Sequence, residues 1–364
     1  MDNGRYIYLD ILKGFSISLV VFCHFVLLPA DSFWGNVLMT MAWGAVPCFM
    51  MTSGALLLNA RSFSWEKFFF KLIKLYVQLA TWRLIYYFIY GFIVGFSRIS
   101  PSLSSVVSYL FLFTDIRGIN VGVMWYIRAF IVVYTLYPFL YYIFHDSGAP
   151  MKSLSVFLLL LVGVSGIVLP SVNWFLKTVI LPEKQAFNIE RLVIFTPFTN
   201  YANMIFYFAL GGLIKKYNND VLNRLKKCRF FPTFLLISGI TMLIVVKFVD
   251  TQSFLWHNVY LSRGYTHFST LLIALGMYTQ FMQYQNFNIY CVKKFGQIIG
   301  QNTMGIYYLH FLFLGVWQTS QILCVPHNAY SLGANCLKTI FFTIFCAALT
   351  IFIKRIPPLR WLVT

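Results

Sequence analysis

The first apolar segment, residues 8–28, reads YLDILKGFSISLVVFCHFVLL and holds a carboxylate, a cation and an imidazole. Lys13 and His24 are eleven residues apart, which at about 100° per residue places both on one face of a helix. Asp10 falls within about 40° of that face. Along the axis, Lys13 and His24 stand roughly 16 Å apart, about half the thickness of a bilayer's hydrocarbon core. Ionisable groups at such depth are expensive unless they face a cavity, so all three are candidates for function.

The composition indicates a membrane protein. The chain has 364 residues, of which 59% are hydrophobic and only 10% are charged, whereas soluble domains carry about 25% charged residues. We therefore predict an all-α, polytopic integral membrane protein with a single domain over residues 1–364. The net charge is +18. Because the chain shows no basic–aromatic module for binding nucleic acid, membrane lipid is the better partner for this charge. The seven cysteines show no metal-ligand spacing, so no metal site is expected.

Hydropathy predicts about ten transmembrane helices. We place them near residues 9–30, 36–58, 67–95, 122–144, 152–170, 197–214, 230–249, 264–283, 300–324 and 335–355. Most Lys and Arg residues then fall on the side that holds the N-terminus, which predicts that both termini are cytoplasmic. Two long outer segments, residues 96–121 and 171–196, either lie along the membrane surface or fold back over a cavity.

Three further segments carry a family resemblance together with the first. They are AVPCFMMTSGALL at 45–57, VMWYIRAFIVVYTLYPFL at 123–140 and NTMGIYYLHFLFL at 302–314. In this order, the four segments resemble acyltransferase family 3, membrane proteins that move acyl groups onto cell-surface glycans, over about residues 6–355. The sequence departs from that pattern at Lys13, where many members have Arg, and at Arg128, near which other branches have an acid.

The resemblance implies a membrane O-acetyltransferase in the bacterial cytoplasmic (inner) membrane. Such an enzyme takes acetyl from cytoplasmic acetyl-CoA and transfers it to a sugar hydroxyl of a surface polysaccharide or its lipid-linked precursor, such as O-antigen, capsule or exopolysaccharide. Two alternatives stay open: a non-enzymatic exporter of glycan, or a transferase of another acyl group such as succinyl. Exporters often show internal repeats, and none is visible here.

The first segment supplies the predicted catalytic residues. His24 acts either as general base or as acyl acceptor, unless it is a structural histidine that bonds a neighbouring helix. Lys13 either binds CoA phosphate, polarises the thioester carbonyl, reaches the inner interface or pairs with Asp10 at i,i+3. Asp10 orients the start of the helix and holds Lys13.

Six residues are predicted on the donor side. Lys71 and Lys74, where the third span enters the membrane, bind either the anionic head of CoA or anionic lipid. Arg83 lies deeper and either pairs with an acid or lines the same tunnel. The other three lie in the fourth span. Trp125 and Tyr126 stack on substrate or belong to an aromatic core, and Arg128 needs a partner because it lies inside a span.

Three residues are predicted to contact the acceptor or the reacting group. Ser53 either packs between helices or points its hydroxyl at the thioester carbonyl. Tyr307 and His310 share one helical side. His310 either assists proton transfer, positions the acceptor, or makes an ordinary hydrogen bond between helices.

Overall fold

The chain folds into helices throughout the part that the structure describes. This computed structural model describes residues 6–25, 33–94, 102–116, 119, 121–146, 148–176, 201–252, 264–283, 290–320 and 332–364. No β-strand occurs in these ranges, which confirms the predicted all-α class. The expected spans 9–30, 67–95, 197–214 and 300–324 each run partly outside the described residues.

The helical elements follow one another closely along the chain. The first half contains α1 (Ile7–Phe25), α2 (Phe33–Ala42), α3 (Ala45–Leu57), α4 (Trp65–Val94), α6 (Leu103–Phe111), η1 (Gly122–Met124), α7 (Trp125–Thr135), α8 (Tyr137–His145) and α9 (Ala149–Gly163). From Val164 onward the elements are η2 (Val164–Val168), α10 (Leu169–Phe175), α11 (Ala202–Lys216), α12 (Asn218–Lys227), α13 (Phe231–Gln252), η6 (Gly264–Thr266), α14 (Phe268–Gln283), α15 (Tyr290–Gln301), α16 (Thr303–Ser320), α17 (Leu332–Arg355) and η7 (Arg360–Val363).

Several of these helices are suited to a bilayer. Among the described residues, five stretches are long and apolar enough to cross a membrane: Ile7–His24, Phe33–Leu57, Pro150–Phe175, Phe231–Val249 and Leu332–Arg355. The bent pair α7 and α8, with an angle of 49° between its halves, is a sixth. The protein is therefore a multi-pass membrane protein. Helices also stand at the other expected positions, but the count of ten spans and the cytoplasmic termini stay predictions.

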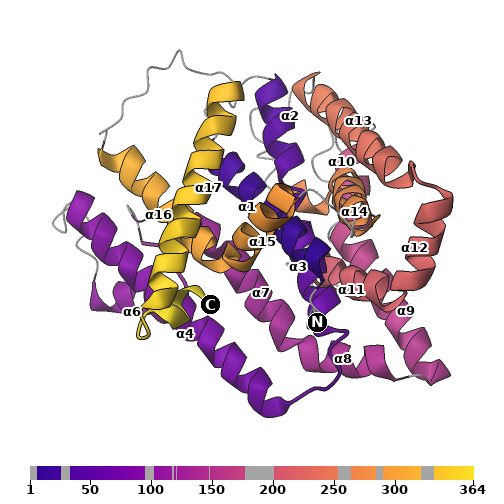
Figure 1. The fold of residues 1–364 in the computed structure, drawn as a ribbon, viewed down its shortest axis with the longest axis horizontal. Coiled ribbons are helices and arrows are strands. Elements are labelled where there is room, and N and C mark those ends of the chain that lie inside the picture. The colour runs from indigo at the N-terminus through magenta and orange to yellow at the C-terminus, as the bar shows by residue number, and fades with distance from the viewer. Residues whose placement is uncertain are drawn as a thin grey trace.

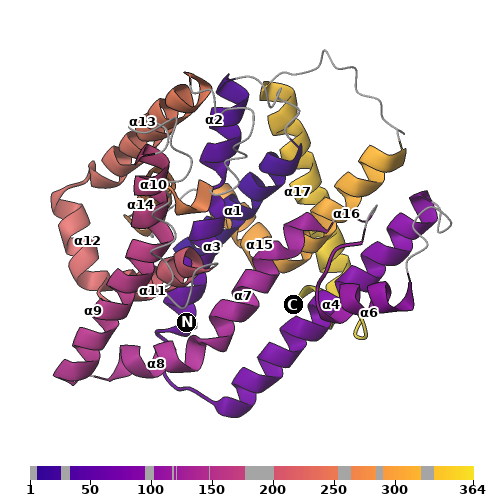
Figure 2. The same cartoon turned by 180° about the vertical axis from the view of Figure 1, so that it is seen from behind.

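The helices α1 and α3 lie at the centre of the molecule in both views (Figure 1, Figure 2). Helices α12, α13 and α14 gather on one side of this pair, and α4 and α6 lie on the other. The central position means that the side chains of α1 face protein on several sides. This arrangement is what allows an ionisable stripe on α1 to face a cavity inside the bundle rather than lipid.

Helix α15 fixes the position of α1, although its residues lie almost entirely outside the expected spans 264–283 and 300–324. The backbones approach closely because α15 carries Gly296 and Gly300 and α1 carries Gly14. A β-carbon at Gly300 would collide with the backbone of Asp10, and small residues at such contacts permit close helix packing. Helix α15 was missed because it is short and amphipathic, with too little apolar length for a span.

The two outer segments differ in what the structure describes. In the first, α6 packs against α4, and the hydroxyl of Tyr109 donates a 3.0 Å hydrogen bond to the backbone carbonyl of Arg83. In the second, residues 177–196 lie outside the described ranges. Helix α6 therefore occupies the side of α4, as both views show (Figure 1, Figure 2).

The C-terminal turn η7 is attached to α4. The indole of Trp82 and the side-chain amide of Gln78 both donate to the carbonyl of Leu362, at 2.8 and 2.7 Å. Trp82 also stacks on Tyr308 of α16, with ring centres 4.9 Å apart. These contacts tie α4, α16 and the end of the chain together, and they bring Thr364 close to the middle of α4.

Candidate functional site

A cavity of about 660 Å³ lies within the bundle, bounded by α1, α3, α4, α7 and α16. Its size falls in the range of roughly 300–1,000 Å³ that is usual for ligand pockets. Eight of the residues predicted from sequence line it: Lys13, His24, Ser53, Lys71, Lys74, Trp125, Tyr126 and Tyr307. The structure thus brings together residues from five helices that are far apart in sequence.

Helix α1 contributes one continuous face to the cavity. Lys13, Ile17, Val20 and His24 all line it, as a helical period of 3.6 residues requires. Lys13 Nζ forms a 2.8 Å ion pair with Asp10 Oδ1, so the predicted i,i+3 pair is present. The Asp10 side chain is nearly buried, whereas that of Lys13 is 21% exposed. Asp10 therefore holds Lys13 from behind while Lys13 faces the cavity.

One end of the cavity is basic. Lys71 and Lys74 line it together with Lys13. Lys71 Nζ lies 5.1 Å from the centre of the Tyr134 ring, and Lys74 Nζ donates a 3.1 Å hydrogen bond to the Thr364 hydroxyl. Within the described ranges, neither lysine forms an ion pair with a carboxylate. Two cations with only neutral contacts suit an anionic ligand.

The other end of the cavity contains His24. Its imidazole is partly exposed, and its ring centre is 5.4 Å from that of His310, at an angle of 39° between the ring planes. His310 is fully buried and does not line the cavity, so it lies behind His24. The two histidines, which the sequence separates by almost the whole chain, form one pair.

An aromatic cluster at the His24 end joins the predicted Trp125 to two residues that no sequence pattern singled out, Trp43 and Tyr265. Tyr265 stacks on Trp43, with ring centres 5.6 Å apart, and lies 5.0 Å from Trp125. All three rings line the cavity. Gly264 makes room for this stack, because a β-carbon there would collide with the Trp43 ring. In a chain that is 20% aromatic, no spacing distinguishes Trp43 and Tyr265 from core residues.

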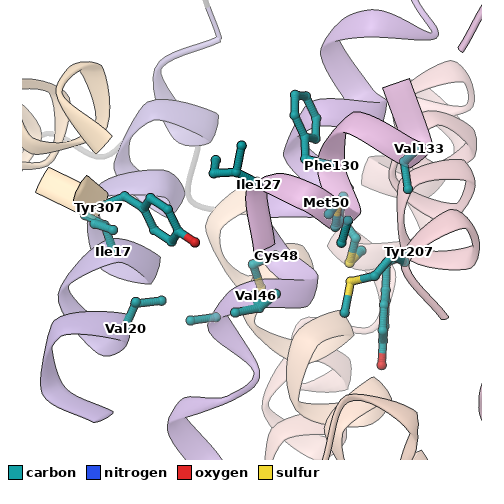
Figure 3. Packing of buried hydrophobic residues seen from close by; sticks show 14 of the residues in the cluster. Ile17, Val20, Val46, Cys48, Met50, Ile127, Phe130, Val133, Tyr207 and Tyr307 are labelled. Atoms are coloured by element: carbon teal, nitrogen blue, oxygen red, sulfur yellow. The ribbon is translucent and has the colours of Figure 1, made fainter. Parts of the chain in front are cut away.

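Ser53, Tyr126 and Tyr307 form the wall between the two ends. The side chains of Ser53 and Tyr126 share a hydrogen bond, and the Tyr126 ring meets that of Tyr307 edge to face at 5.7 Å. Figure 3 shows Tyr307 reaching from α16 toward Ile127 of α7, beside Ile17 of α1. This wall is apolar except for three hydroxyl groups, so it can cover an uncharged part of a ligand.

The two arginines predicted on the donor side lie away from the cavity. Arg83 is fully buried, and its Nε donates to the carbonyl of Tyr109 at 2.7 Å. Its guanidinium also bonds the carbonyl of Thr114 and lies 3.6 Å from Asp115 Oδ1, which supplies the expected acid. Arg83 thus holds the segment after α6 rather than lining the tunnel.

Arg128 holds the same segment from α7. Its guanidinium donates a 3.1 Å hydrogen bond to the carbonyl of Phe113. Phe113 has a left-handed backbone with φ of 57°, a conformation that costs free energy for a bulky residue and persists where neighbours hold it. The structure therefore separates Arg83 and Arg128 from the eight predicted residues that share the cavity.

Among the described residues, no three His, Cys, Asp or Glu side chains lie close enough to hold a metal ion.

Comparisons with known proteins give one match. No curated protein and no solved structure matches the chain. A family model described as an acyltransferase domain matches residues 6–355, which is nearly the whole chain. The protein therefore belongs to acyltransferase family 3 and is a multi-pass membrane acyltransferase.

Proposed function

We propose that the protein is an O-acetyltransferase of the bacterial cytoplasmic membrane. It takes acetyl from cytoplasmic acetyl-CoA and transfers it to a sugar hydroxyl of a surface polysaccharide or of its lipid-linked precursor. One observation carries this proposal: a single cavity has lysines at one end and an imidazole at the other. Membership of the family supports acyl transfer in general. The lysines at one end of the cavity support acetyl-CoA as the donor, and the imidazole at the other end supports His24 as the base.

The basic end suits the donor. Acetyl-CoA carries its phosphates at one end and its thioester at the other, joined by the pantetheine arm. When extended, that arm is on the order of the ~16 Å that separates Lys13 from His24 along α1. Lys71 and Lys74 bind the phosphates by charge-assisted hydrogen bonds, and the thioester then lies near His24. Tyr126, in the wall between the two ends, covers the arm, and Trp125 lies at the thioester end.

His24 performs the proton transfer. It takes the proton from the acceptor hydroxyl as that oxygen attacks the thioester carbonyl carbon. A C–O bond forms, the C–S bond breaks, and the CoA thiolate receives the proton that His24 took. The products are an acetyl ester and free CoA, so atoms and charge balance. Acyl transfer through His24 itself is the other route, because an imidazole is also a nucleophile.

The surrounding wall protects this reaction. Water competes with a sugar hydroxyl for the thioester, and a site that excludes bulk water suppresses hydrolysis. Phe49, Phe130 and the Trp43–Tyr265 stack all line the cavity. Their apolar surfaces leave room for the flat face of a sugar ring and little polar surface to hold water.

The test uses membrane vesicles with labelled acetyl-CoA and a crude lipid-linked glycan fraction. We expect wild-type vesicles to label the glycan and His24→Gln vesicles to label it at least roughly 100-fold more slowly, because general base catalysis contributes about 10²–10⁴-fold. The matched control is His145→Gln, since His145 is exposed at the end of α8 and does not line the cavity. Equal labelling by wild type and His24→Gln would overturn the proposed role of His24.

Two further outcomes separate the alternatives. If wild-type vesicles transfer no label but move labelled glycan across the membrane, the protein is an exporter. If they transfer succinyl from succinyl-CoA faster than acetyl from acetyl-CoA, the proposed acetyl group is wrong, but acyl transfer with His24 as the base is retained. Release of free CoA that depends on added acceptor supports the transferase directly.

A further inference from the structure

We propose that His310 is a positioning residue for His24: in the reacting state, its Nε2 accepts the N–H of the His24 imidazole that faces away from the cavity. This inference rests on the proposed function, in which His24 is the base. It assigns each nitrogen of the two rings a role, and it gives His310 a part in the reaction without contact to either substrate.

The first step concerns the tautomer of His310. Its Nδ1 lies 2.9 Å from the carbonyl oxygen of Ile306, one turn earlier in α16. A carbonyl oxygen only accepts hydrogen bonds, so Nδ1 carries the proton. A neutral imidazole with a proton on Nδ1 has a bare lone pair on Nε2. The backbone of α16 therefore sets Nε2 of His310 as an acceptor.

The second step concerns what this acceptor faces. His310 is fully buried, and its Nε2 has no hydrogen-bond partner among the described residues. A buried polar atom without a partner costs about 1–3 kcal/mol. Such an atom calls for a partner, and a group that changes position or protonation state during the reaction supplies one.

The third step identifies the partner. Three rings surround that of His310: His24 at 5.4 Å, Tyr307 at 6.1 Å and Phe311 at 6.3 Å between centres. Phe311 has no polar hydrogen. The Tyr307 oxygen accepts from the backbone N–H of Ile127, consistent with its direction in Figure 3, and its hydroxyl makes no hydrogen bond to Nε2. His24 is thus the described neighbour that can supply an N–H to Nε2.

The consequence is a defined orientation for the base. When one nitrogen of His24 donates its proton to His310, the other nitrogen is bare and faces the cavity, ready to take the proton of the acceptor hydroxyl. The same hydrogen bond stabilises the imidazolium that forms. His310 thus plays the part that a carboxylate plays for the histidine of hydrolytic triads. No proton moves onto His310 in this scheme, so the overall reaction stays balanced.

Two amide substitutions separate a positioning role from a structural one. In His310→Gln, the amide oxygen stands about where Nε2 stood, so it can accept from His24. In His310→Asn, the amide stands about where Nδ1 stood, so it can bond Ile306 but cannot reach His24. A structural role is preserved by Asn, whereas a positioning role is preserved by Gln. His310→Phe removes both contacts.

The measurement is kcat and both KM values for acetyl transfer, with the midpoint of thermal unfolding recorded for each variant. We expect Phe and Asn to lower kcat by roughly 10- to 100-fold, part of the total that general base catalysis supplies, with KM changed less than twofold. We expect Gln to retain kcat within about fivefold of wild type.

Several results would overturn the inference. A kcat for Asn equal to or above that for Gln would show that the bond to Ile306 is what matters. Wild-type kcat in His310→Phe would remove His310 from the reaction, and if the Phe variant fails to fold, the Gln–Asn comparison decides alone. Absence of transfer by wild type would instead overturn the proposed function, and the inference with it.

Discussion

Helix α4 carries cations in two regions whose surroundings are opposite. Near its start, Lys71 and Lys74 line the cavity and contact only neutral groups, the Tyr134 ring and the Thr364 hydroxyl. Nine residues after Lys74, Arg83 is fully buried against α6, where it bonds two carbonyls and lies near a carboxylate. A cation in an apolar helix therefore indicates that it has a partner. If the partner belongs to the protein, the cation stabilises the fold, and if the partner is a ligand, the cation binds it.

The difference has an energetic basis. Arg83 has its charge distributed over fixed acceptors of its own chain, so binding a ligand would require breaking those bonds. Lys74 has no such acceptor beyond one hydroxyl. The lysine region can thus bind an anion, whereas Arg83 already has its acceptors within the protein.

The largest expected effect is on stability, from Arg83→Met. This change leaves the carbonyls of Tyr109 and Thr114 without their donors in a buried position, which costs roughly 2–5 kcal/mol. We expect a marked fall in the thermal unfolding midpoint in detergent, with unchanged donor KM in the fraction that stays folded. Leu84→Met, at the next position on α4, is the control and should leave the midpoint within the error of measurement.

The contrary result would change the comparison. If Arg83→Met folds normally and raises the donor KM more than fivefold, Arg83 contacts the donor in a state that the structure does not show. The two regions of α4 would then form one ligand site.

The second effect is on donor binding, from the double variant Lys71→Ala and Lys74→Ala. A hydrogen bond to a charged group contributes about 1.5–3 kcal/mol, so we expect the KM for acetyl-CoA to rise by at least roughly tenfold. The acceptor KM and the unfolding midpoint should not change. Lys67→Ala is the matched control, because Lys67 lies on the same helix, is exposed and does not line the cavity.

The same double variant tests whether the lysines serve lipid instead. Acetyl-pantetheine lacks the nucleotide phosphates, so its use should be equally slow in wild type and in the double variant. A rise in KM for both donors, or for neither, would contradict a phosphate-binding role for Lys71 and Lys74.

The sequence predicted the α1 face well because one helix contains all of it. Helical periodicity relates Lys13 to His24 without knowledge of any other element, and both line the cavity. The same arithmetic places Arg83 about 180° around α4 from Lys74, so the spacing indicates that the two cannot face one cavity. What spacing cannot supply are the partners of Arg83, which lie 26–32 residues away, within α6 and in the segment after it.

The rest of the site depends on tertiary contacts that leave no local pattern. The pairing of His24 with His310 joins α1 to α16, and the Trp43–Tyr265 stack joins the break between α2 and α3 to η6. Position along an apolar segment shows that His310 is deep, but not that it lies behind His24. Helix α15 was missed for the opposite reason: its apolar face is too short for a span, although its glycines are what position α1.

The smallest expected effect comes from Arg128→Met, which tests the same segment from α7. Arg128 makes one hydrogen bond to the segment, at the carbonyl of Phe113, whereas Arg83 makes two and lies near Asp115. We therefore expect a loss of about 1 kcal/mol in unfolding free energy, clearly less than for Arg83→Met, with unchanged KM for acetyl-CoA. Because Phe113 holds a left-handed backbone there, Phe113→Gly relieves that strain and should recover part of the lost stability in the Arg128→Met background. A tenfold rise in donor KM for Arg128→Met, with stability intact, would instead place this arginine in the donor site and remove the distinction between the two regions.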